Sequence, residues 1–164
     1  MANRNEAGFG LIPSMVAGNS PSTHGMSKYE IDAAESNAIF NGEPVKVDIS
    51  ASTGGYIVTA GAGTAFVYDN PNQEYIIAAD ATLGANLALR KSKIGLTYAT
   101  TAVAGSTLTG RSSVQLGIST AATTAKQLRT VRVAEDIENQ DQTAAFCSMV
   151  VLINLHQYKV GSLA

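Results

Sequence analysis

The chain has 164 residues and a mass of 17.0 kDa, which is enough for one domain with its own core. Hydrophobic residues make up 45% of it, but aromatic residues only 6% and Trp is absent, so we expect a core of small side chains that draws part of its stability from contacts between subunits. A net charge of -2, with the cations scattered along the chain, excludes the basic stripe that nucleic-acid binding requires.

The amino-terminal region, residues 1–28, mixes Gly, Pro, Ser and Asn and shows neither a helical nor a strand period. It holds one small apolar cluster, Phe9-Gly-Leu-Ile-Pro13. We therefore predict an extended arm whose Phe9, Leu11 and Ile12 dock on the same subunit or on a neighbouring one. Plain flexibility is the alternative. The first residues do not resemble the start of a signal peptide, and no run approaches about 18 apolar residues, so no membrane partner is expected.

Residues 29–164 change to short apolar alternations separated by turn residues, the pattern of a sheet that faces water on one side. Asn41-Gly42 and Asp69-Asn-Pro-Asn72 indicate turns, and Gly61-Ala-Gly63 indicates a hairpin between its flanking strands. Residues 83–89 fit either a short helix or a loop. The pattern predicts strands at 45–49, 56–60, 65–68, 73–79, 94–98, 113–119 and 128–134.

The last apolar run begins at Phe146 and continues through Met149, Val151 and Ile153 without a polar alternation. A strand that is apolar on both faces must be covered on both faces. It is therefore a central strand, a barrel wall beneath another layer, or part of a subunit interface. The sequence predicts an all-β fold: a single antiparallel β-sandwich or barrel of jelly-roll type, with the amino-terminal arm attached.

Catalytic groups are sparse. The two histidines are His24, in the predicted arm, and His156, at the end of the last strand, where we expect a structural hydrogen bond. Ser148 and His156 are the best pair for a hydrolase, but the chain has no Gly-x-Ser-x-Gly elbow. It also has no dinucleotide fingerprint and no phosphate loop, so no cofactor is expected.

Metal binding has equally little support. Cys147 is the only cysteine, and we expect it to be a small buried hydrophobe. Four carboxylates cluster between Glu135 and Asp141, but counting from Asp136 the sixth position is Asp141 instead of Gly, which excludes an EF-hand. We expect a solvated acidic loop and no metal. The cations from Arg90 to Lys93 are interpreted as a solvated loop or a strand edge.

Several segments together resemble a family of small head proteins of tailed bacteriophages, the capsid decoration or cement proteins. The similar segments follow in order along nearly the whole chain, although the stretch between Val47 and Phe66 is shorter than is usual in that family. They are Phe9-Gly-Leu-Ile-Pro13, Ile39-Phe-Asn-Gly-Glu-Pro-Val-Lys46, Asp69-Asn-Pro-Asn-Gln-Glu-Tyr75, Ala79-Asp-Ala-Thr82, Gly110-Arg-Ser-Ser-Val-Gln-Leu116, 120–124, Leu128-Arg129 and Val151-Leu-Ile-Asn-Leu-His-Gln-Tyr158.

The resemblance implies a protein without enzymatic activity that sits on the exterior of a phage capsid, is assembled in the host cytoplasm, and clamps subunits of the major capsid protein. Phe9, Leu11 and Ile12 are the expected arm anchor. Met149, Val151 and Ile153 are the expected buried interface, and the two-sided last strand predicts a homodimer or homotrimer. The alternative is a binding module on the virion surface or tail that recognises a host receptor or a glycan; a small hydrolase is the third reading.

Overall fold

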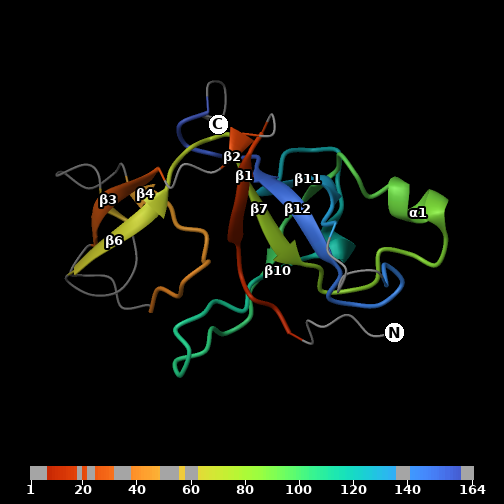
Figure 1. The fold of residues 1–164 in the computed structure, drawn as a ribbon, viewed down its shortest axis with the longest axis horizontal. Coiled ribbons are helices and arrows are strands. Elements are labelled where there is room, and N and C mark those ends of the chain that lie inside the picture. Colours follow the sequence, from red (N-terminus) through yellow and green to blue (C-terminus); the bar gives the residue numbers. More distant parts are fainter. Residues whose placement is uncertain are drawn as a thin grey trace.

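The protein is described by a computed structural model over residues 7–17, 20–21, 25–31, 38–48, 56–57, 63–135 and 141–159. Its largest sheet has six strands in the order β2-β1-β7-β12-β11-β8 (Figure 1). These strands are β1 (Ile12–Val16), β2 (Ser20–Pro21), β7 (Gln73–Ala78), β8 (Thr97–Tyr98), β11 (Leu128–Val133) and β12 (Ser148–Ile153).

A second sheet has four strands in the order β4-β5-β3-β6, and a third has two. The four strands are β3 (Met26–Ile31), β4 (Val47–Asp48), β5 (Tyr56–Ile57) and β6 (Gly63–Tyr68). The two-stranded sheet pairs β9 (Thr100–Thr101) with β10 (Gln115–Leu116). One short helix, α1 (Leu87–Lys91), and one 3-10 turn, Ile118–Thr120, complete the described elements.

The all-β class is confirmed. Paired strands run antiparallel except β3 and β5, which are parallel. Over the described ranges the strands close no barrel, and the arrangement is consistent with a β-sandwich. In Figure 1 the four-stranded sheet lies to one side of the six-stranded sheet, and the turn that follows β6 leads directly into β7.

Strand β12 lies between β7 and β11 in the six-stranded sheet, so of the three alternatives for the last apolar run the structure has the central strand. Its register pairs Met149 with Ile77 and Val151 with Tyr75. Because side chains alternate across a strand, Met149 and Val151 point to one face and Val150 to the other. We call these the core face and the outer face. Val150 is only 3% exposed, which explains why both sides of this strand are apolar.

The core face is covered by the chain segment that carries β10. Val114, Leu116 and Ile118, whose alternation with polar residues predicts a single buried side, all belong to the core. Asp80 fixes this cover to the end of β7: its carboxylate accepts hydrogen bonds from the Ile118 N–H (2.8 Å) and from the Thr101 hydroxyl (3.0 Å). The expectation that Cys147 is buried is also confirmed.

The amino-terminal segment differs from a strand-free arm, because residues 12–16 form β1 and pair with β7. Leu11 enters the core, and its N–H donates to the Gly42 carbonyl over 2.7 Å. Gly10 permits this approach: its φ is +75°, and a Cβ there would lie 2.7 Å from the Gly42 oxygen. The segment therefore docks on its own chain. Sequence reasoning missed β1 because its pairing comes from a distant strand and not from its own period.

The hairpin expected around Gly61-Ala-Gly63 falls largely on residues 58–62, which lie outside the described residues. In the described parts of its two strands, β3 lies between β5 and β6, parallel to the first and antiparallel to the second. The described strands β5 and β6 therefore belong to one sheet but are not neighbours in it. A hairpin was expected because the two strands are close in the sequence. In the structure β6 pairs with β3 at six positions, from Met26 opposite Tyr68 to Ile31 opposite Gly63.

The predictions of a turn after Asp69 and of a short helix or loop at 83–89 agree with the structure. The turn at Asn70 is present, with its side chain accepting from the Asn72 N–H (2.9 Å) and its carbonyl from the Gln73 N–H (3.0 Å). Helix α1 begins at Leu87, where the Asn86 side chain accepts from the Leu89 N–H as an N-cap. The cations at Arg90 and Lys91 form its last turn, where they face the negative end of the helix.

Candidate functional site

The predicted arm anchor is divided between core and surface. Phe9 is half-buried and Leu11 is in the core. Ile12 lies opposite Ile76 on the outer face of the six-stranded sheet and is 44% exposed. Of these three residues, Ile12 alone presents a large apolar surface to a partner.

The predicted buried interface is part of the core of a single chain. Met149 and Val151 have 0% exposure, and Ile153 is half-buried against the same core. A side chain without exposed area cannot contact a neighbouring subunit directly. The apolar run at β12 therefore stabilises the fold, and surface for partners has to be sought elsewhere.

One face of the four-stranded sheet exposes apolar side chains. Along β3 the exposed residues are Met26, Lys28 and Glu30, which alternate with half-buried ones. Phe66 on β6 lies opposite Lys28 and is 65% exposed, and Met26 is 44% exposed. We call Met26, Lys28 and Phe66 the Phe66 face. Exposed phenylalanine beside methionine is typical of a protein contact surface.

A second exposed apolar group lies in residues 102–111, which we call the Leu108 loop. Leu108 is 94% exposed although hydrogen bonds hold the loop around it: the Ser106 N–H donates to the Arg111 carbonyl (2.9 Å) and the Gly110 N–H to the Ser106 carbonyl (2.8 Å). Gly105 packs on the Phe40 ring, where a Cβ would lie 2.4 Å from it. The loop, green to cyan in Figure 1, projects away from both larger sheets.

A polar network joins the four-stranded sheet to the segment after β12. The Tyr29 hydroxyl donates to Asp69 Oδ2 over 3.1 Å and lies 2.9 Å from the Tyr158 hydroxyl. Since a phenol has one proton, the Tyr158 hydroxyl donates to Tyr29. Burial and the two hydrogen bonds raise the pKa of Tyr29. The network joins β3 of the four-stranded sheet to the segment after β12.

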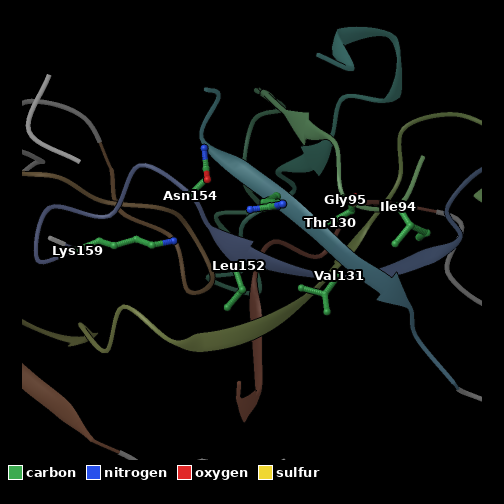
Figure 2. Close-up of a pocket in the computed structure, with 8 residues that line it drawn as sticks. Ile94, Gly95, Thr130, Val131, Leu152, Asn154 and Lys159 are labelled. Atoms are coloured by element: carbon green, nitrogen blue, oxygen red, sulfur yellow. The ribbon is translucent and has the colours of Figure 1, made fainter. Parts of the chain in front are cut away.

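A shallow pocket of about 280 Å³ lies on the outer face of β11 and β12 (Figure 2). We call it the Arg129 pocket. Figure 2 shows Val131 and Leu152 pointing into the same region from neighbouring strands, with Lys159 entering from the other side. None of the eight lining residues is acidic: they are Ile94, Gly95, Arg129, Thr130, Val131, Leu152, Asn154 and Lys159. Sequence reasoning missed this pocket because four distant segments form it.

The pair considered for hydrolysis is not brought together. Ser148 lies opposite Ala78, where β7 ends, whereas Leu152 lies opposite Glu74, near the start of β7. His156 lies beyond that second end, and its Nδ1 accepts from the Tyr158 N–H over 3.2 Å. Burial lowers the pKa of His156. The expected structural hydrogen bond is therefore present.

The acidic segment falls mostly outside the described residues, since Asp136 and Glu138 are among those not described. Asp141 accepts hydrogen bonds from the N–H and the hydroxyl of Thr143, which lower its pKa. Over the described ranges no three His, Cys, Asp or Glu side chains are grouped as metal ligands would be. Within those ranges no helix is long and apolar enough to cross a membrane.

Comparisons with protein families, curated proteins and solved structures found no match to this chain.

Proposed function

We propose that the chain is a capsid decoration protein of a tailed bacteriophage, which binds the exterior of the head and clamps subunits of the major capsid protein without catalysing a reaction. The observation that carries this proposal is the exposure of large apolar side chains at three separate places. These are the Phe66 face, the Leu108 loop, and Leu87 and Leu89 on α1, which are 56% and 49% exposed.

The three places lie on different sides of the chain in Figure 1, with β6 at the left, the Leu108 loop below and α1 at the right. A protein that binds one small ligand needs a single hollow, whereas a clamp touches several neighbours at once. Each contact is small, but contacts linked through one rigid subunit act together and give high avidity. The ordered resemblance to phage head proteins supplies the identity of the neighbours.

The proposal includes self-association as a homodimer or homotrimer, and assembly onto the head in the host cytoplasm. Met149 and Val151 lie in the core of the chain and cannot contact a second copy. A second copy is therefore expected to bind the surfaces that expose apolar side chains. Light scattering at tens of micromolar tests it, and a monomer at that concentration contradicts it.

The alternative function, a virion-surface or tail module that recognises a receptor or glycan, has less support. Sugar binding commonly uses exposed aromatic rings. The exposed aromatic rings among the described side chains are Phe66, at 65%, which has no hydrogen-bonding group, and Tyr158, at 53%, whose hydroxyl is bonded to Tyr29. Binding of the purified chain to a glycan array, without affinity for phage heads, would favour the alternative.

The test mixes the purified chain with heads that lack it, prepared from a phage with the corresponding gene deleted, and measures the bound chain after sedimentation of the heads. We expect saturable binding to the exterior. Phe66→Glu and Leu108→Glu are expected to weaken it by about tenfold each, since each places a charge in an apolar contact.

Ser27→Ala is the matched control, because Ser27 lies in β3 but on the face opposite Lys28. Binding of this variant should equal that of the unchanged chain. Heads that bind no chain at all, or that bind the two Glu variants as tightly as the unchanged chain, contradict the proposal.

A further inference from the structure

We propose that the Arg129 pocket is a docking site for an acidic, aliphatic segment of a partner protein. The inference deepens the proposed function, since it rests on the chain being a protein-binding subunit and names the chemistry of one partner segment. It does not depend on whether that partner is the major capsid protein.

Charge is the first argument. The chain carries a net charge of -2, yet the pocket contains two cations and no carboxylate. Arg129 is exposed and lies opposite Leu152 in the register of β11 and β12. Figure 2 shows the Lys159 ammonium directed toward the pocket from the carboxy-terminal side. A carboxylate that enters the pocket is attracted by the positive charge of its lining.

Further cations precede the pocket wall in the sequence. Ile94 in its wall follows directly after Lys93, and Arg90 and Lys91 end the adjoining helix α1. Three of the eleven cations of the chain therefore lie within the four positions that precede Ile94.

The apolar part of the pocket is the second argument. Ile94 is 36% exposed, and Val131 and Leu152 are half-buried. These aliphatic side chains come from three segments of the chain that line the pocket together. They suit a Val, Ile or Leu side chain of an extended partner segment, and an acidic side chain two positions away lies on the same face of that segment and can reach the cations.

The walls are held in place before any partner arrives. The Gly95 N–H donates to the Thr130 carbonyl (3.0 Å), and the Thr130 N–H donates to the Leu96 carbonyl (3.1 Å). On the opposite wall the Asn154 N–H donates to the Gln127 carbonyl (2.7 Å) and its Nδ2 to the Lys126 carbonyl (3.0 Å). A fixed pocket costs little ordering entropy on binding.

Shape favours a protein segment over the other anionic partners. At about 280 Å³ the pocket is slightly smaller than sites that enclose a small-molecule ligand, which begin at about 300 Å³. A lipid surface is bound by apolar side chains that project from a basic face, whereas Val131 and Leu152 line a hollow. Side chains of an extended partner segment fit this geometry best.

The experiment uses fluorescence anisotropy with the full chain and a labelled ten-residue peptide that carries Val and Glu in turn at every second position, with Ser between them, so that both lie on one face of the extended peptide. The same peptide with Lys in place of Glu, and vesicles of phosphatidylserine and phosphatidylcholine, are the comparison ligands. We expect saturable binding of the Glu peptide, no binding of the Lys peptide, and a loss of affinity as salt is raised. Methyl NMR spectra should shift at Ile94, Val131 and Leu152.

Arg129→Glu is expected to weaken binding of the Glu peptide by about tenfold, and the double variant with Lys159→Glu is expected to bind the Lys peptide instead. Lys46→Glu is the matched control, since it reverses an exposed cation that does not line the pocket and should change nothing. Because the readout is peptide binding, it is independent of binding to heads.

The inference is overturned if the Glu peptide does not bind, if both peptides bind equally, or if NMR shifts lie away from the pocket. Binding to the vesicles that exceeds binding to the peptide would make the site a lipid site instead. Self-association that Arg129→Glu abolishes would make the occupant a second copy. Both results would contradict a separate acidic partner segment.

Discussion

The hydroxyl oxygens of Tyr29 and Tyr158 lie 2.9 Å apart, so that a hydrogen bond joins β3 in the four-stranded sheet to the segment after β12. Both residues also lie close to the turn that links the two larger sheets, through the bond from Tyr29 to Asp69. The relative position of the two sheets therefore depends on a small polar network in addition to apolar packing.

Tyr158→Phe is expected to lower the free energy of unfolding by only about 0.5–1 kcal/mol, because Tyr158 is half exposed and Tyr29 keeps its bond to Asp69. The more specific result concerns titration. The pKa of Tyr29, which burial and these bonds raise, should move back toward its usual value in this variant. Spectrophotometric titration of the tyrosines measures it.

Tyr68→Phe serves as the comparison, since the Tyr68 hydroxyl takes no part in the bonds between Tyr29, Asp69 and Tyr158. If the Tyr29 titration is the same in Tyr158→Phe and in the unchanged chain, the network does not determine it.

Gly10→Ala is expected to lower the free energy of unfolding by about 2 kcal/mol or more. Its positive φ alone costs an alanine about 1–2 kcal/mol, and the new Cβ would lie 2.7 Å from the Gly42 oxygen. Urea unfolding measures the change.

Gly110→Ala isolates the first of these two costs. Gly110 also has a positive φ, of +66°, but nothing lies within 4 Å of its added Cβ. Gly110→Ala should lower the free energy of unfolding by about 1 kcal/mol, which is less than the loss expected for Gly10→Ala. Equal losses in the two variants would mean that the close approach of Gly10 to Gly42 does not fix the amino-terminal segment.

Alkaline pH is expected to destabilise the fold through its buried phenols. Burial raises the pKa of Tyr98 to about 12 and that of Tyr75 to about 12. An unfolded tyrosine loses its proton near pH 10, before the folded one does. Their contribution to stability is therefore complete below pH 10 and is lost as the pH rises to about 12. Urea midpoints at a series of pH values measure this slope.

Tyr98→Phe separates the titration from the rest of the side chain. It removes the hydrogen bond from the Tyr98 hydroxyl to the Lys93 carbonyl, so it should cost about 1 kcal/mol at neutral pH. It should also flatten the decline above pH 10. A decline as steep as that of the unchanged chain would exclude Tyr98 as a cause.

A pair of variants is expected to distinguish residues of the core, which determine stability, from residues of the contact surface, which determine binding. Met149→Ala removes a fully buried side chain and should cost about 2–5 kcal/mol of stability. Phe66→Glu alters an exposed side chain and should change stability by only about 0.5 kcal/mol, while it weakens binding to heads. A Phe66→Glu variant that unfolds as readily as Met149→Ala would place Phe66 in the core of the chain and not on a contact surface.

The sequence predicted those elements whose own pattern carries the information. The alternation at Val114, Leu116 and Ile118 identified one buried side, and the unbroken run at Met149 to Ile153 identified a strand that is covered on both faces, which in the structure is a central strand. It did not predict β1, which contains Pro13 and becomes a strand because β7 offers it an open edge. Nor did it predict that β3 separates β5 from β6, because pairing partners depend on the assembled sheet.

The candidate surfaces were predicted less well for a related reason. A hydrophobic run in the sequence does not indicate whether its side chains are buried by the same chain or by a partner. Met149 and Val151 are buried by the same chain. The exposure of Leu108 depends on a hydrogen-bonded loop with no periodic signal. The Arg129 pocket combines residues from four segments, so only the folded chain brings them together.

A cryo-electron microscopy map of the phage particle that carries this chain tests the central proposal most directly. The proposal predicts density for the six-stranded and four-stranded sheets on the outer surface of the head, with the Phe66 face or the Leu108 loop against the major capsid protein. Density for the chain in the tail, or its absence from the particle, would contradict a role as a capsid decoration protein.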